Sequence, residues 1–145
     1  YCASLGVLVS GDMMLPRIST NISVHESEPE SNPLASFLAS IERFRELPAD
    51  TLTLPAHGKP FTGLHTRIDQ LQGHHRDRLA EVLEACAQSP STAAEMLPVL
   101  FKRPLDLHQT TFAMGQSGGH LHGLWFDGLL RRERSPDGCW RFRAA

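Results

Sequence analysis

Two side chains that can bind a metal ion follow short apolar runs in the first part of the chain. Asp12 comes after Leu5–Val9, in the sequence S-G-D, and His57 comes after Thr51–Leu54, in the sequence P-A-H-G. Runs of β-branched and aliphatic residues are typical of buried strands. Strand ends gather at one edge of a layered fold, so a carboxylate and an imidazole placed there can converge on one cation. A catalytic zinc site usually needs three protein ligands and a water, and the sequence offers no obvious third ligand.

The composition is that of a globular protein of one ordinary domain or two small ones, at 145 residues. The formal net charge of −2 gives no general attraction to nucleic acid or anionic membranes. No signal peptide or membrane-spanning segment is indicated, so we expect no membrane partner. Three cysteines without a C-x-x-C pair favour a reducing cytosol, and we expect a cytoplasmic protein. The chain opens on strand-like sequence without an initiator Met, which suggests that it is cut from a longer protein.

The first 63 residues have the pattern of a layered α/β unit. Besides the two apolar runs, Ile18–Val24 alternates apolar and polar residues, as a strand or an extended segment does. Apolar residues at helical spacing over 34–47 predict an amphipathic helix, with Asn32 as its N-cap and Pro33 in its first turn. A strand, a helix and a second strand are the components of such a unit.

The remaining 82 residues predict three helices and a terminal hairpin, which together form a compact winged-helix outline. The hairpin is indicated by the sequence P-D-G between two short apolar and basic runs. The predicted elements are a helix over 64–88, a short helix over 91–100, a helix over 108–126, and strands at 129–132 and 139–142.

Taken together, the two halves resemble the C-terminal part of metallo-β-lactamase-fold hydrolases that carry an appended winged-helix domain. The resemblance rests on the order and spacing of motifs that cover nearly the whole chain. These are Ser10-Gly11-Asp12 with Leu15-Pro16, Pro55–Pro60, Arg67-Ile68, His75-Arg76 with Arg78, Thr92-Ala93, and Gly119-His120-Leu121 with Leu124 and Gly128. The resemblance implies an α+β fold. Residues 1–63 would form the C-terminal portion of an αββα sandwich, and 64–145 would form a winged-helix-like domain entered by the long helix.

The resemblance also implies roles for two residues. Asp12 becomes a carboxylate that can bridge two metal ions, and His57 becomes the last histidine ligand of the second ion. The metal would be zinc, as one or two ions, and metal-activated water would attack a thioester, an ester, a lactam or an RNA phosphodiester. The family's main signature, H-x-H-x-D-H, is absent, and His120-Leu121-His122 lies in a predicted helix downstream of both other motifs. We therefore expect this chain alone to bind metal weakly and to be catalytically inactive.

Further candidate residues lie in the second half of the chain. His75 and Arg76 are either part of a solvated basic helix face or a contact for an anionic substrate group. Arg131, Arg132 and Arg134 make the hairpin basic, so it could touch phosphates without reading sequence. The helix over 108–126 contains no Arg or Lys, so we expect no sequence-specific DNA binding.

Two expectations concern partners. The intact protein would act on a small molecule or on RNA; the alternative is that the second half is a binding module that contacts nucleic acid or a partner subunit. Strands in residues 1–54 that lack neighbours would expose unpaired edges, which favours self-association.

Overall fold

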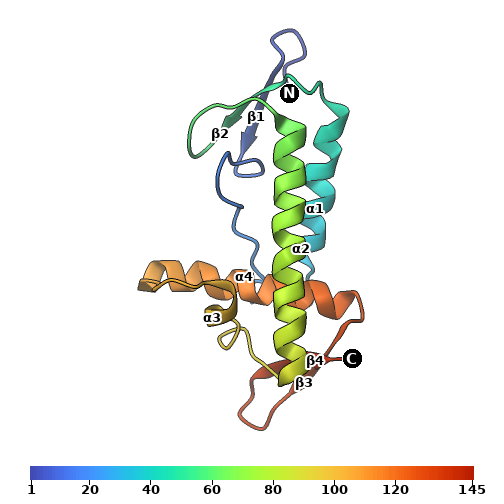
Figure 1. Cartoon of the computed structure of the whole chain (residues 1–145), viewed down its shortest axis with the longest axis vertical. Helices are drawn as coiled ribbons and strands as arrows, with labels where there is room; N and C mark the ends of the chain where they lie inside the picture. Colours follow the sequence, from blue (N-terminus) through green and yellow to red (C-terminus); the bar gives the residue numbers. More distant parts are fainter. The chain divides into compact units, whose positions relative to one another are not determined.

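The computed structural model describes residues 1–145, and its elements follow the predicted order along the chain (Figure 1). They are β1 (Val7–Gly11), α1 (Pro33–Glu42), the 3₁₀ helix η1 (Arg43–Glu46), β2 (Leu52–Pro55), α2 (Leu64–Gln88), α3 (Leu97–Leu100), α4 (Leu107–Phe126), β3 (Leu130–Arg134) and β4 (Trp140–Ala144). None of these helices combines the length and the apolar character that a membrane-spanning helix needs.

Two structural units share these elements. One comprises residues 1–20 and 36–74, and the other comprises 21–35 and 75–145. Helix α2 starts at Leu64, next to the predicted domain boundary at residue 63, whereas the division into units runs through α2 after His74. The domain boundary at residue 63 therefore stays a prediction.

In the first unit, β1 and β2 form a two-stranded parallel sheet, which confirms both predicted strands (Figure 1). Their register pairs Val7 with Leu52 and Val9 with Leu54, and it shifts by one residue between Val9 and Gly11. Because the strands are parallel and adjacent, their carboxyl ends lie side by side. This arrangement is what places the two loops of the candidate site next to each other.

The two faces of the β1–β2 sheet differ in burial. Leu8 and Thr53 on one face are buried, whereas Val9 on the other is 74% exposed. Parallel sheets are usually covered on both faces, so an exposed apolar face is uncommon. Backbone bridges from Cys2 to Val7 and from Thr53 to Phe61 pair parts of the sheet edges. The αββα sandwich and self-association through strand edges remain predictions, since this unit contains one two-stranded sheet.

The predicted helix over 34–47 corresponds to α1 followed by η1. Asn32 caps it as expected: its side-chain oxygen accepts a hydrogen bond from the backbone N–H of Ala35 at 3.2 Å. The segment Ile18–Val24 forms no strand: Ile18 lies in a bend, and residues 19–24 pair with no strand. The predicted strand is therefore wrong, and the alternative of an extended segment stays a prediction.

Helix α2 is continuous from Leu64 to Gln88 and passes Gly73 without a break (Figure 1). One stripe along it is fully or almost fully buried, at intervals of three, four and seven residues. This stripe consists of Leu64, Ile68, Leu71, His75, Val82 and Cys86. The spacing is that of the core-facing side of a helix. Burial raises the pKa of the Cys86 thiol to about 11, which keeps it protonated at neutral pH.

The second unit contains the predicted short helix, long helix and hairpin. Thr92 and Glu95 form a reciprocal capping box before α3, with the Thr92 N–H donating to the Glu95 carboxylate at 2.7 Å. Asp106 caps α4 by accepting from the N–H of Gln109 at 2.8 Å. Strands β3 and β4 pair antiparallel, from Leu130 opposite Ala144 to Arg134 opposite Trp140. The order and type of the elements are as predicted, but α3 covers only Leu97–Leu100 of the predicted helix over 91–100. The winged-helix-like arrangement stays a prediction.

Glycines on α4 allow a neighbouring segment to pack closely against this helix. A Cβ atom on Gly119 would lie 2.6 Å from the backbone oxygen of Ile22, and one on Gly115 would lie 1.9 Å from Oγ of Ser23. The side chain of Ile22 is buried by this packing. The structure thus shows that the neighbour of these glycines is the segment at residues 22–24.

Candidate metal centre and adjoining pocket

The structure brings Asp12 and His57 together at the carboxyl ends of β1 and β2. Nε2 of His57 lies 3.5 Å from Oδ1 of Asp12. Both side chains are accessible, with 72% of the imidazole and 58% of the carboxylate side chain exposed. The sequence analysis expected these two groups to lie side by side at one edge of the sheet, and they do.

Hydrogen bonds fix the turn that follows β1. The hydroxyl of Ser10 donates to the carbonyl of Met14 at 3.0 Å and contacts the carbonyl of Leu54 at 3.4 Å. The N–H of Ala56 donates to the carbonyl of Gly11 at 3.0 Å. Gly11 has a positive φ of 54°, a conformation that glycine adopts without steric cost. These bonds tie the Asp12 turn to the loop that carries His57.

The pair fits part of a zinc site. Ligand atoms at about 2.0–2.2 Å from a tetrahedral zinc ion lie about 3.3–3.6 Å from each other, which includes the distance between Nε2 of His57 and Oδ1 of Asp12. A carboxylate and a neutral imidazole are ligands that zinc accepts. No cluster of three or more His, Cys, Asp or Glu side chains suited to a metal ion occurs in the chain. The residues present thus provide two donor atoms whose separation is compatible with binding to one ion.

The loop after Asp12 is held from two sides. Gly58, with a φ of 87°, lies so close to Pro16 that a Cβ atom would be 2.7 Å from its Cγ. From α2, the guanidinium of Arg67 donates to the carbonyl of Leu15 at 2.7 Å and to that of Ile18 at 2.9 Å. Burial lowers the pKa of Arg67, whose charge no carboxylate neutralises. Arg67 is therefore a clamp on this loop.

Replacing Arg67 with alanine should loosen the loop, because both carbonyls lose a charged donor. Hydrogen bonds to charged groups contribute about 1.5–3 kcal/mol each, so amide exchange at Met13 should accelerate about tenfold or more. The exposed, unpaired Arg43 is a matched control, and Arg43→Ala should leave this exchange unchanged. Equal exchange rates in Arg67→Ala and the parent chain would show that the clamp is not needed.

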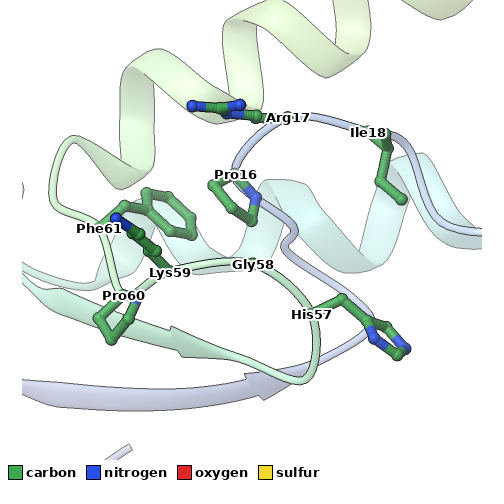
Figure 2. A pocket seen from close by; sticks show the side chains of 8 residues that line it. All are labelled: Pro16, Arg17, Ile18, His57, Gly58, Lys59, Pro60 and Phe61. Carbon is green, nitrogen blue, oxygen red and sulfur yellow. The ribbon is translucent and has the colours of Figure 1, made fainter.

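A pocket of about 510 Å³ adjoins His57 in the first unit (Figure 2). It is formed by the loop after Asp12 and the loop after β2. Its lining residues are Pro16, Arg17, Ile18, His57, Gly58, Lys59, Pro60 and Phe61. The volume is in the range of small-molecule sites, about 300–1,000 Å³.

The two residues predicted as a substrate contact, His75 and Arg76, differ in their exposure to solvent. His75 is completely buried, and its Nδ1 lies 3.1 Å from Nε2 of His120, whose Nδ1 donates to the carbonyl of Gln116 at 2.7 Å. A side chain without exposed surface cannot contact a substrate in this conformation, so His75 serves packing. The side chain of Arg76 is 78% exposed, and a substrate contact there stays a prediction.

The arginines of the hairpin also differ from one another. Arg132 pairs with Glu30 at 2.7 Å, and its guanidinium lies 3.9 Å and 4.3 Å from the ring centroids of Trp125 and Trp140. Its side chain is only 10% exposed, so it is already engaged within the chain. Arg131 and Arg134 are exposed, and their contact with phosphates stays a prediction.

Three residues of the site were given no functional role in the sequence analysis. Arg17 and Lys59 line the pocket, and Arg67 supports it. A signal was present, since Lys59 lies two residues after His57 and Arg17 five residues after Asp12. Cations so near a candidate ligand pair are worth testing as substrate contacts.

The second half of the chain is similar to a known protein family. Residues 79–145 match the family described as "Metallo-beta-lactamase-like, C-terminal domain". No protein of curated function matches the chain.

Two solved structures resemble the chain over its full length. A beta-lactamase domain protein from Burkholderia ambifaria is 53% identical, with a TM-score of 0.96, and the match covers 43% of that protein. A metallo-beta-lactamase family protein from Thermus thermophilus is 31% identical, with a TM-score of 0.84 and 44% of its length covered. The chain thus spans less than half of either protein. Its second half is similar to the metallo-beta-lactamase-like C-terminal domain, and the whole chain shares the fold of these proteins over the matched part.

Proposed function

We propose that this chain contributes two ligands, Asp12 and His57, to the zinc centre of a metal-dependent hydrolase. The observation that supports the proposal most directly is the distance of 3.5 Å between Nε2 of His57 and Oδ1 of Asp12 at adjoining strand ends. The similarity to metallo-beta-lactamase family proteins adds independent support. The bond to be hydrolysed would belong to a thioester, an ester, a lactam or an RNA phosphodiester.

In this proposal the residues of the chain hold the metal ion and keep its ligands in position. Asp12 offers two carboxylate oxygens, and His57 offers one nitrogen in its neutral form. A bound zinc ion would lower the pKa of a water molecule and polarise the bond to be cleaved. Arg67 and Ser10 keep the loop after β1 in place, so that Asp12 stays directed at His57. The chain provides two of the ligands that catalysis needs and should be inactive alone.

A chimera tests this function. In it, the chain replaces the matching 43% of the Burkholderia protein, which is 53% identical to it. We expect the chimera to hydrolyse at least one of the four substrate classes and to lose this activity when a chelator removes the metal. Asp12→Asn in the chimera should lower the rate about a hundredfold or more, because metal assistance is worth several kcal/mol.

Two results would contradict the proposal. The first is hydrolysis by the 145-residue chain alone that a chelator abolishes, since two ligands would then suffice. The second is a chimera whose chelator-sensitive activity is unchanged by Asp12→Asn. Glu28→Gln, in the exposed loop of the second unit, is the matched control and should leave the rate unchanged.

A further inference from the structure

The pocket beside His57 combines an apolar lining with two cations. Pro16, Ile18, Pro60 and Phe61 provide the apolar surface, and apolar atoms make up most of it. Arg17 and Lys59 are the charged lining residues apart from His57, and no Asp or Glu lines the pocket. Such a lining suits a ligand that has both an apolar part and a negative charge.

The two cations have no internal partner. None of the ion pairs of the chain includes Arg17 or Lys59. Most other arginines do pair, such as Arg45 with Glu42 and Arg143 with Glu133. An anionic group could therefore bind to Arg17 and Lys59 without displacing a carboxylate of the protein.

The cations and the imidazole lie at different sides of the pocket. Figure 2 shows the nitrogen ends of Arg17 and Lys59 on one side and the ring of His57 on the other, with Pro16 between them. Asp12 adjoins His57. A ligand that reaches both sides must separate its anionic group from the part held near Asp12 and His57 by an apolar spacer.

We propose that this pocket recognises the substrate by an anionic group, a carboxylate or a phosphate, bound to Arg17 and Lys59. An apolar spacer lies on Pro16 and Phe61, and the scissile bond lies at Asp12 and His57. The inference rests on the proposed function, because it places that bond at the metal centre. Since the site is a pocket with an apolar lining rather than an extended basic surface, the substrate is a small molecule and not RNA.

Binding of simple probes to the 145-residue chain tests the pocket without metal or turnover. The probes are hexyl phosphate, hexanoate and neutral hexanol, and amide chemical shifts are followed by NMR. Both anions should shift the amides of residues 17, 18, 58, 59 and 61, with affinities at least tenfold above that of hexanol. The difference should shrink at high salt, because Arg17 and Lys59 are exposed.

The double variant Arg17→Gln with Lys59→Gln should lose about tenfold or more in affinity for both anions. Arg43→Gln with Lys102→Gln removes the same charge from exposed positions elsewhere and should bind like the parent chain. Three results would overturn the inference: hexanol binding as tightly as the anions, full affinity in the Arg17 and Lys59 variant, or displacement of hexyl phosphate by a short single-stranded RNA at equal phosphate concentration. The last result would identify a nucleic acid as the ligand.

The two proposals can fail separately. Asp12→Asn leaves the pocket cations intact, so this variant should still bind the anionic probes. If the probes bind but the chimera shows no chelator-sensitive hydrolysis, the proposed function fails and the anion site stands. If hydrolysis depends on Asp12 but the probes do not bind, the anion site fails alone.

Discussion

Replacing Gly119 with alanine should destabilise the second unit by about 2 kcal/mol. The new methyl group would lie 2.6 Å from the backbone oxygen of Ile22, so either α4 or the segment at residues 22–24 must shift. Overpacking of this kind typically costs about 1–3 kcal/mol, and the better helix propensity of alanine offsets only part of it. Urea unfolding followed by tryptophan fluorescence reports on this unit, because both tryptophans, Trp125 and Trp140, belong to it.

Gly118 provides a matched control on the same helix. A Cβ atom there would meet Val24 at 3.9 Å, which is ordinary van der Waals contact. Gly118→Ala should therefore stabilise the unit by about 0.5–1 kcal/mol, since alanine is the better helix former. Equal stability of Gly119→Ala and the parent chain, or equal losses in both variants, would show that the close approach of Ile22 to α4 is not tight.

The elements with local signals were predictable from the sequence. Helix α2 has a long apolar stripe, α1 has Asn32 as its N-cap, and the hairpin has a P-D-G turn. The neighbourhood of Asp12 and His57 was predictable as well, because adjacent strand ends follow from two apolar runs and parallel pairing. The elements need only the residues near each signal, whereas the proximity of Asp12 and His57 also needs the rule that a strand, a helix and a second strand form one layered unit.

The burial of His75 follows the apolar stripe of α2 and not the basic residues beside it in the sequence. Its position follows Ile68 and Leu71 and precedes Val82 at helical spacing, so it falls on the buried stripe of α2. The neighbouring His74, Arg76 and Arg78 suggested a solvated basic face instead. The position on the stripe determines that His75 is buried. A buried polar side chain needs a hydrogen-bond partner, which His120 supplies.

The pocket was not predictable, because its walls come from two loops whose side-chain directions depend on tertiary contacts. Arg17 lies in its place because Arg67, fifty residues later, holds the carbonyls on either side of it. Similarly, Arg132 is engaged with Glu30 and two tryptophans that no local pattern connects. Such contacts arise only when distant segments meet in the folded chain.

Asp12→Asn and His57→Ala should each remove the shared zinc-binding site of this chain. The asparagine keeps the shape of the side chain but loses the charge that attracts the cation, and the alanine removes the imidazole donor. With two protein ligands the affinity for zinc is weak, so each loss should reduce it at least about tenfold, or about 1.4 kcal/mol. His25→Ala, in the exposed loop of the second unit, is the matched control and should leave zinc binding at the site unchanged.

The most direct test of the metal centre is a zinc titration of the 145-residue chain at pH 7.5, followed by NMR of the His57 ring and the Asp12 carboxylate. Imidazole binds a metal ion in its neutral form, so the titration is run on the basic side of neutrality. We predict that both groups shift together with one dissociation constant, and that neither shifts at the same zinc concentrations when the other is substituted. Zinc-induced shifts of one group that persist unchanged without the other, or shifts confined to other histidines, would contradict a shared metal ion.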